Sequence, residues 1–272
     1  MIRATKFNHL ILLFQTKYHK QKALLLGLII GFLSSCLGIG GGIIMIPALM
    51  KFFNNNIKKA IGTSLCITAP IAFFGAFFYY IKLESAIRFD MAIFAFIGSV
   101  IGSQIGSILE NKIKNEILEI LFAFLLLLIG LKLIGIINLT NVNISIINEN
   151  ALYLPTILLG ILLGFFTVLF GIGGGVIIVP ILTFLFSFPI HSAIATSLAI
   201  IVPNTILAIF FHKKLGNIDF QIAKFIIPTA IIGSFLGAFF ANKLPAETLT
   251  FIFGLFLLAM AGKTFFQKLQ RI

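Results

Sequence analysis

The sequence predicts an all-α polytopic membrane protein made of two homologous four-segment repeats, with six to eight transmembrane helices. Three observations lead to this fold class: the composition, the length of the apolar segments and an internal duplication. Of the 272 residues, 60% are apolar and 10% are charged, and the mean hydropathy is +1.14. Because a soluble domain carries roughly 25% charged residues and cannot bury so much apolar surface, lipid is expected to cover most of the chain.

Eight apolar segments are each long enough to cross the hydrocarbon core of a bilayer, which is about 30 Å thick. In order they are 23–50, 60–81, 91–109, 117–137, 152–186, 193–211, 223–241 and 249–266. No signal-peptide cleavage site follows the basic start of the chain, so we expect the first segment to be retained. The predicted divisions are a basic cytoplasmic tail (1–22), membrane repeat 1 (23–137), a polar linker (138–151), membrane repeat 2 (152–266) and a C-terminal tail (267–272).

The two halves of the chain repeat one another. When Gly27 is set against Gly160, 24 residues align without a gap and 11 of them are identical. The same offset of 133 pairs Pro70 with Pro203, and an offset of 131 later pairs Gly102 with Gly233. Such a duplication is typical of secondary transporters.

Each half contains the sequence GIGGG followed five residues later by a proline. Glycine costs a helix interior roughly 1 kcal/mol relative to alanine, and proline removes a hydrogen-bond donor, so we expect the helix to break there. A broken backbone in hydrocarbon must be buried in protein or line a watery cavity, and the start of the next half-helix favours negative charge. If the two breaks meet, they form a candidate anion site made of Gly38, Gly40, Gly41, Gly42 and Pro47 with Gly171, Gly173, Gly174, Gly175 and Pro180.

Polar side chains inside the spans are further candidates for the substrate site. A Thr-Ser pair occurs at corresponding positions of the two halves, and one asparagine lies within a later apolar segment. Helix caps or hydrogen bonds to the helix's own backbone are the alternative use of these hydroxyls. The candidates are Thr63, Ser64, Thr196, Ser197 and Asn204. By contrast, Gly98, Gly102 and Gly106, at a spacing of four, are predicted to let two helices pack closely.

Several classes of function are excluded by the ionisable residues. The formal net charge is +12, but the lysines stand singly between apolar segments, so nucleic acid is not an expected partner. All eight carboxylates lie at segment ends or in loops, which leaves no proton relay in mid-membrane. No spacing of histidine, cysteine or carboxylate suits a metal ion or catalysis. We therefore expect no catalytic residue, no metal and no cofactor.

Two membrane topologies remain open. With eight crossings and a cytoplasmic N-terminus, 13 loop lysines and arginines are inside and 6 outside. If the glycine-broken segments 23–50 and 152–186 instead return to the side they entered, the count becomes 16 inside and 3 outside, and the halves become inverted repeats. The rule that cytoplasmic loops are positive favours this second arrangement, but a tilted span with an extended interruption remains compatible with the segment lengths.

The doubled pattern G-x-x-x-G-x6-G-I-G-G-G-x4-P, at 27–47 and 160–180, with A-x-x-T-S at 60–64 and 193–197, resembles the sulfite exporter TauE/SafE family of TSUP-type permeases. The resemblance covers about 23–266. It implies a multi-pass carrier of the cytoplasmic membrane whose relatives export or take up sulfite, organosulfonates and related small anions. The departures near the A-x-x-T-S motif are mild: Gly62 corresponds to Ala195, and Lys58 to His191.

Taken together, these features predict a secondary transporter for a small anion, bound near the midplane at the paired helix breaks and moved by alternating access. An anion channel built on the same repeat is the alternative. The expected partners are the anion and the lipid bilayer of the cell membrane, with both termini cytoplasmic. A homo-oligomer is also compatible with the sequence.

Overall fold

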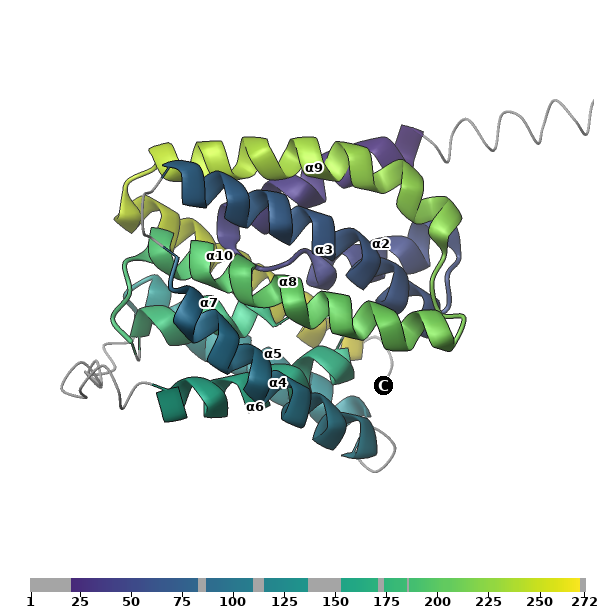
Figure 1. The fold of residues 1–272 in the computed structure, drawn as a ribbon, viewed down its shortest axis with the longest axis horizontal. Coiled ribbons are helices and arrows are strands. Elements are labelled where there is room, and N and C mark those ends of the chain that lie inside the picture. Colours follow the sequence, from purple (N-terminus) through teal and green to yellow (C-terminus); the bar gives the residue numbers. More distant parts are fainter. Residues whose placement is uncertain are drawn as a thin grey trace, which may run out of the picture.

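The computed structural model describes residues 21–82, 87–109, 115–136, 153–170, 174–184 and 186–269. All secondary structure in these ranges is helical (Figure 1). The predicted tail up to residue 20 and the predicted linker over 138–151 lie outside the described residues. After a first helix, Gln21–Leu37, the helices are α2 (Gly42–Phe53), α3 (Ile57–Lys82), α4 (Phe89–Leu109), α5 (Asn115–Leu133), α6 (Tyr153–Phe170), α7 (Gly175–Phe184), α8 (Ile190–Lys214), α9 (Phe220–Lys243) and α10 (Ala246–Leu269).

Six of the eight predicted apolar segments each form one uninterrupted helix, namely α3, α4, α5, α8, α9 and α10. Five of these are long and apolar enough to cross a membrane; the sixth, α5, has 19 residues. Because an α-helix rises about 1.5 Å per residue, 19 residues reach about 28 Å, close to the thickness of the hydrocarbon core.

The outer surface of the bundle is apolar. On α4, for example, Ile93, Ile97, Ile101 and Ile105 are all exposed and follow one another at a spacing of four, so they form one ridge along the helix. Similar exposed leucines and phenylalanines occur on the first helix, α6, α9 and α10. A surface of this kind suits lipid and agrees with the membrane class that the composition predicts.

The other two apolar segments are each divided into two helices, and the first pair folds back on itself. Lys22, at the start of the first helix, has its Nζ 5.1 Å from the ring centroid of Phe52, at the end of α2. The chain therefore leaves this pair at the end of the bundle where it entered, as Figure 1 shows. We call this end the terminal end; the starts of α3 and α9 and the end of α8 also lie there, and Thr63 of α3 bonds Asp219 before α9.

The second pair, α6 and α7, lies at the opposite end, which we call the linker end. Tyr153, at the start of α6, stacks on Phe94 near the start of α4, with ring centroids 4.4 Å apart. Phe184, at the end of α7, lies 4.0 Å from the Nζ of Lys132 at the end of α5. Both ends of the α6–α7 pair therefore lie at one end of the bundle.

Helices from different halves pack closely through their glycines. A Cβ added at Gly98 or Gly102 of α4 would overlap a backbone carbonyl of α6, and one added at Gly233 or Gly237 of α9 would overlap a carbonyl of the first helix. The predicted packing role of Gly98 and Gly102 is confirmed, and a Cβ added at Gly106 would lie 3.0 Å from the carbonyl oxygen of Phe165. The first helix of each half thus packs on the second uninterrupted helix of the other half, α9 or α4.

The centre of the bundle is formed by α3 and α8, which pack side by side, and by the short helices α2 and α7 against them. In α7, every residue from Gly175 to Pro180 is buried. The two helix breaks consequently lie in the protein interior, where lipid does not reach the freed backbone groups.

Candidate functional site

The first helix break comprises residues 38–41. Gly38, Gly40 and Gly41 have φ angles of 67°, 75° and 76°, values that favour glycine, and α2 begins at Gly42. Two carbonyl groups freed by the break are satisfied by side chains: Thr68 Oγ1 donates to Gly40 O at 2.5 Å, and Ser197 Oγ donates to Gly38 O at 2.8 Å. Hydroxyls from both central helices therefore hold the broken backbone.

The second break separates α6 from α7. Gly174 has a φ of 81°, and α7 begins at Gly175. The predicted site residues Gly171 and Gly173 lie outside the described residues. A Cβ added at Gly175 would overlap the carbonyl of Gly38 and lie 2.7 Å from the Cα of Ile39. The two breaks thus touch, backbone against backbone.

The two prolines do not end a helix. Pro47 lies inside α2 and Pro180 inside α7, and both helices continue beyond them. The expectation of a break at glycine plus proline is therefore correct for the glycines and wrong for the prolines. Each proline removes one backbone donor and disturbs one turn, a cost that the packing of these helices against α3 and α8 offsets.

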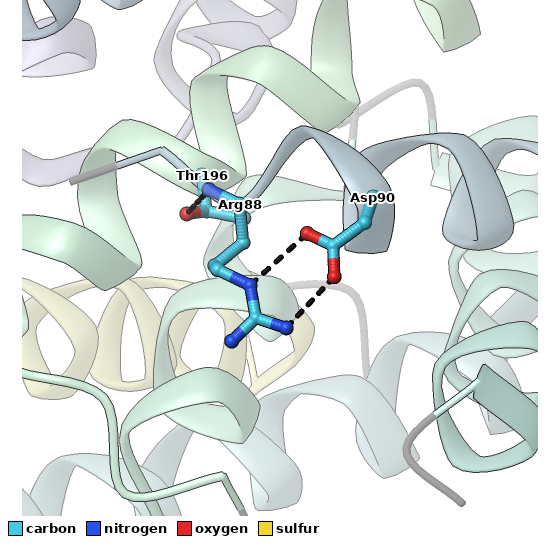
Figure 2. A network of polar contacts seen from close by, with 3 residues as sticks. All are labelled: Arg88, Asp90 and Thr196. Carbon is cyan, nitrogen blue, oxygen red and sulfur yellow. Dashed lines mark hydrogen bonds and ion pairs between the residues drawn. The ribbon is translucent and has the colours of Figure 1, made fainter. Parts of the chain in front are cut away.

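The Thr-Ser pairs connect the halves. Thr63 Oγ1 accepts a hydrogen bond from the N–H of Asp219 at 2.8 Å, and Thr196 Oγ1 accepts one from the N–H of Arg88 at 3.3 Å. Figure 2 shows the second contact beside the ion pair of Arg88 with Asp90, whose closest atoms are 2.7 Å apart. Each threonine thus holds the connection that precedes α4 or α9 of the other half.

The serines of the same pairs differ from each other. Ser197 donates to Gly38, as described above. Ser64, its counterpart on α3, is buried, and its Oγ has no hydrogen-bond partner within the ranges that the structure describes. The residue that the repeat pairs with Gly38 is Gly171, which is outside those ranges.

A cavity of about 390 Å³ lies between α3, α4, α6 and α8. Its mouth is at the terminal end of the bundle, where α3 begins and α8 ends, and its base is formed by polar side chains of α4, α6 and α8. We take the mouth to be where the lining is exposed or half-buried, at Lys58, Gln104, Phe211, His212, Leu215 and Asn217, and the base to be where its polar side chains are buried, at Ser99, Thr167 and Asn204. Of the predicted candidates that the structure describes, only Asn204 lines this cavity.

Sequence reasoning missed Thr68, Ser99 and Thr167. Thr68 and Ser99 both had a periodic signal, since Thr68 lies four residues after Ser64 and Ser99 is followed by Ser103 and Ser107 at the same spacing. Thr167 had a signal, since it precedes the second GIGGG by four residues and aligns with Ser34 before the first. Among the described residues, no group of three or more histidine, cysteine or acidic side chains is placed to hold a metal ion.

Comparison with known proteins gives consistent results. The family described as sulfite exporter TauE/SafE matches residues 3–133 and 156–271. "Probable membrane transporter protein YunE" of Bacillus subtilis (strain 168) is 30% identical over 265 residues, which cover 89% of this chain and 96% of that protein. No solved structure matches the chain.

Two further relatives carry similar names. A "Probable membrane transporter protein" of Xylella fastidiosa (strain 9a5c) is 28% identical over 240 residues, which cover 86% of this chain and 90% of that protein. "Probable membrane transporter protein MJ0441" of Methanocaldococcus jannaschii is 37% identical over 120 residues, 42% of this chain and 45% of that protein. The match to membrane transporters therefore extends over most of the chain.

Proposed function

Because this chain belongs to the sulfite exporter TauE/SafE family and is a multi-pass membrane transporter, we propose that it moves a small anion such as sulfite or a short organosulfonate. The anion binds near the middle of the membrane, close to the two helix breaks, and reaches the two sides alternately.

The contact between the two breaks carries this proposal. The N-termini of α2 and α7 both lie in the interior of the bundle, and Gly175 at the start of α7 touches the backbone of Gly38. A helix N-terminus carries unpaired N–H groups and about half a positive charge. Two such termini in an interior protected from water favour an anion without any charged side chain.

We further propose six membrane crossings and two re-entrant helix pairs. The crossings are α3, α4, α5, α8, α9 and α10, and the re-entrant pairs are the first helix with α2, and α6 with α7. The fold-back of each pair supports this topology, because a pair that returns to the end where it begins adds no crossing. Each half then crosses the membrane three times, and this odd number makes the halves, 23–137 and 152–266, inverted repeats joined by the linker 138–151.

The distribution of basic residues orients this topology. The terminal end holds Lys51, Lys58, Lys59, Lys213, Lys214 and Lys224, whereas the linker end holds Lys82, Arg88, Lys132 and Lys243. Since cytoplasmic loops are enriched in lysine and arginine, we place the terminal end, with both chain termini, in the cytoplasm of a cell that carries the protein in its cytoplasmic membrane.

The difference between the two halves supports alternating access over a channel. Asn204, Thr167 and His212 of the cavity correspond to Ile71, Ser34 and Tyr79 in the other half. At the corresponding place Tyr79 is fully buried and polar side chains bond to the protein: Ser35 Oγ lies 2.7 Å from Ser234 Oγ, Ser234 Oγ donates to Ile71 O at 2.9 Å, and Tyr79 donates to Ser35 O at 3.3 Å. The cavity is open at the terminal end, and the corresponding residues around Tyr79 in the other half are packed together. Access from one side at a time is the arrangement that a carrier requires.

Transport by purified protein in proteoliposomes tests the helix-break site. Gly41→Leu and Gly174→Leu each place a side chain at a positive φ, which costs about 1–3 kcal/mol, and fill the space at the break. We expect sulfite or methanesulfonate flux to fall at least tenfold in both variants. Gly262→Leu on α10, where an added Cβ meets nothing within 4 Å, is the control and should keep wild-type flux.

The same preparation separates the carrier from the channel. A carrier gives flux that saturates with anion concentration and shows counterflow, whereas a channel gives unitary currents in single-channel recording. Unchanged flux in correctly inserted Gly41→Leu and Gly174→Leu would rule out the helix-break site.

A further inference from the structure

Two polar groups at the base of the cavity have hydrogen-bonding atoms that the protein does not use. Asn204 and Thr167 are each 5% exposed, and neither Asn204 Nδ2 nor Thr167 Oγ1 has a hydrogen-bond partner within the described parts of the chain. Both residues line the cavity. Because a buried donor without a partner is costly and rare, two of them at the base of one cavity indicate a place for a ligand.

A neighbouring hydroxyl orients the asparagine. Ser99 Oγ of α4 lies 2.5 Å from Asn204 Oδ1 of α8 and 2.8 Å from Phe96 O, and it donates its one hydrogen to Asn204 in the shorter of these two contacts. This bond occupies the amide oxygen, so the NH2 group, which can only donate, is the part of Asn204 left for the ligand. A ligand that accepts hydrogen bonds is therefore favoured.

The charge around the cavity has the sign that suits an anion. Lys58 lies at the mouth together with His212, and no carboxylate lines the cavity among the residues described. At the base, Thr167 Oγ1 is 3.3 Å from the position that a Cβ on Gly174 would take, so it lies beside the N-terminus of α7. The cavity thus runs from a cation at its mouth to a helix N-terminus at its base.

The position and walls of the cavity limit the ligand. Asn204 precedes Leu215 at the mouth by 11 residues, about 16 Å along a helix, so the base lies near the midplane of the proposed span. The walls include Leu65, Leu207 and Ala208. Apolar walls and neutral donors compensate poorly for the lost hydration of a doubly charged ion, and they suit a singly charged one.

We propose that Asn204 Nδ2 and Thr167 Oγ1 bind a small, singly charged oxyanion at the base of this cavity, and that Lys58 attracts it at the mouth. This assignment rests on the proposed transport function and names the ligand-binding groups of that function. A volume of about 390 Å³ leaves room for several water molecules beside a small anion, so the anion enters with part of its hydration.

Binding is tested by ligand-induced thermal stabilisation of the purified protein, with methanesulfonate as the singly charged probe and sulfate as the doubly charged one. The variants are Asn204→Leu, Asn204→Asp and Thr167→Val. The matched control is Thr205→Val, because Thr205 is buried on the same helix, is not among the residues that line the cavity, and bonds no described group other than the carbonyls of Ile201 and Val202.

We expect methanesulfonate to stabilise the wild type and Thr205→Val at lower concentration than sulfate does. Loss of one hydrogen bond to a charged ligand raises the Kd roughly tenfold to a hundredfold, which we expect for Asn204→Leu and Thr167→Val. The ligand-free Tm of Asn204→Leu should change little, because the variant removes an unused buried donor together with the bond from Ser99, whose hydroxyl keeps Phe96 O as an acceptor at 2.8 Å. A structural role alone would lower that Tm instead.

Asn204→Asp distinguishes a donor from an acceptor at this position. A carboxylate of the same shape should abolish methanesulfonate binding, and wild-type affinity in this variant would overturn the anion assignment. Wild-type affinity in both Asn204→Leu and Thr167→Val would overturn the site. Equal affinity of the wild type for sulfate and methanesulfonate would overturn the preference for a singly charged anion.

Uptake of radiolabelled methanesulfonate and sulfite into proteoliposomes separates this inference from the proposed function. Wild-type transport combined with an unchanged KM in Asn204→Leu overturns the site and leaves the transport proposal standing. If methanesulfonate binding requires Asn204 but the protein transports neither anion, the site stands and the transport proposal is overturned. A wild type that neither binds nor moves these anions overturns both.

Discussion

Four hydroxyl groups join pieces of the chain that are far apart in the sequence. Thr63 and Thr196 each hold the connection before a helix of the other half, and Thr68 and Ser197 hold the carbonyls of the first break. In a membrane interior, freed backbone groups find no water. Single hydroxyls at the right places therefore decide whether a broken helix can persist there.

Ser197→Ala is the sharpest test at the scale of one residue. It leaves the buried carbonyl of Gly38 without the hydroxyl that now donates to it, and loss of such a partner costs about 1–3 kcal/mol. We expect a lower Tm in thermal unfolding of the detergent-solubilised protein. Thr205→Val, whose hydroxyl bonds within its own helix, should shift the Tm much less; equal shifts would show that the Gly38 contact contributes nothing special.

At the scale of elements, the contact of α4 with α6 depends on the absence of side chains. Gly102→Ala adds a methyl group where the carbonyl of Ile161 lies, so α4 and α6 must separate, at a cost of about 1–3 kcal/mol for overpacking. Gly262→Ala on α10 adds the same group where nothing lies within 4 Å, and higher helix propensity should stabilise it by up to about 1 kcal/mol. Thermal unfolding of the two variants should therefore shift in opposite directions, and a stabilised Gly102→Ala would contradict the close packing.

At the scale of the whole molecule, the proposed topology places the linker outside the cell and the end of α8 inside. With Cys36 and Cys66 replaced by alanine, a single cysteine is introduced as Asn143→Cys or as Lys214→Cys. We expect an impermeant thiol reagent to label Asn143→Cys in intact cells and Lys214→Cys only after the membrane is opened. Labelling of Asn143→Cys only from the cytoplasmic side would favour eight crossings.

Hydropathy and glycine content were sufficient to predict most of the helices. The six uninterrupted segments correspond to α3, α4, α5, α8, α9 and α10 within a few residues, because the thickness of lipid sets the length of an apolar helix. The glycines also marked where the other two segments divide. The prolines were misread, because the cost of one proline inside a helix depends on packing that the local sequence does not contain.

The candidate site was predicted less completely, because its contacts join distant segments. Asn204 was singled out as a polar residue in a span, but its partner Ser99 is 105 positions away, and no local pattern links the two. The cavity also depends on a difference between halves whose sequences align well. In that alignment Asn204 corresponds to Ile71 and Thr167 to Ser34. Alignment alone predicts two similar sites, whereas the full burial of Tyr79 and its bond to Ser35 O show that the two places are packed differently.

The exchange of helices between the halves has a consequence for synthesis. During synthesis, the glycine face of α4 has no packing partner until α6 has been inserted. The first helix remains without its partner α9 for a longer stretch of synthesis. Neither half can complete its own packing. The helices of the first half therefore keep their glycine faces exposed to lipid until the second half has been inserted. Two separately expressed fragments, divided within 138–151, should therefore associate into one particle when made together, and each should be degraded when made alone.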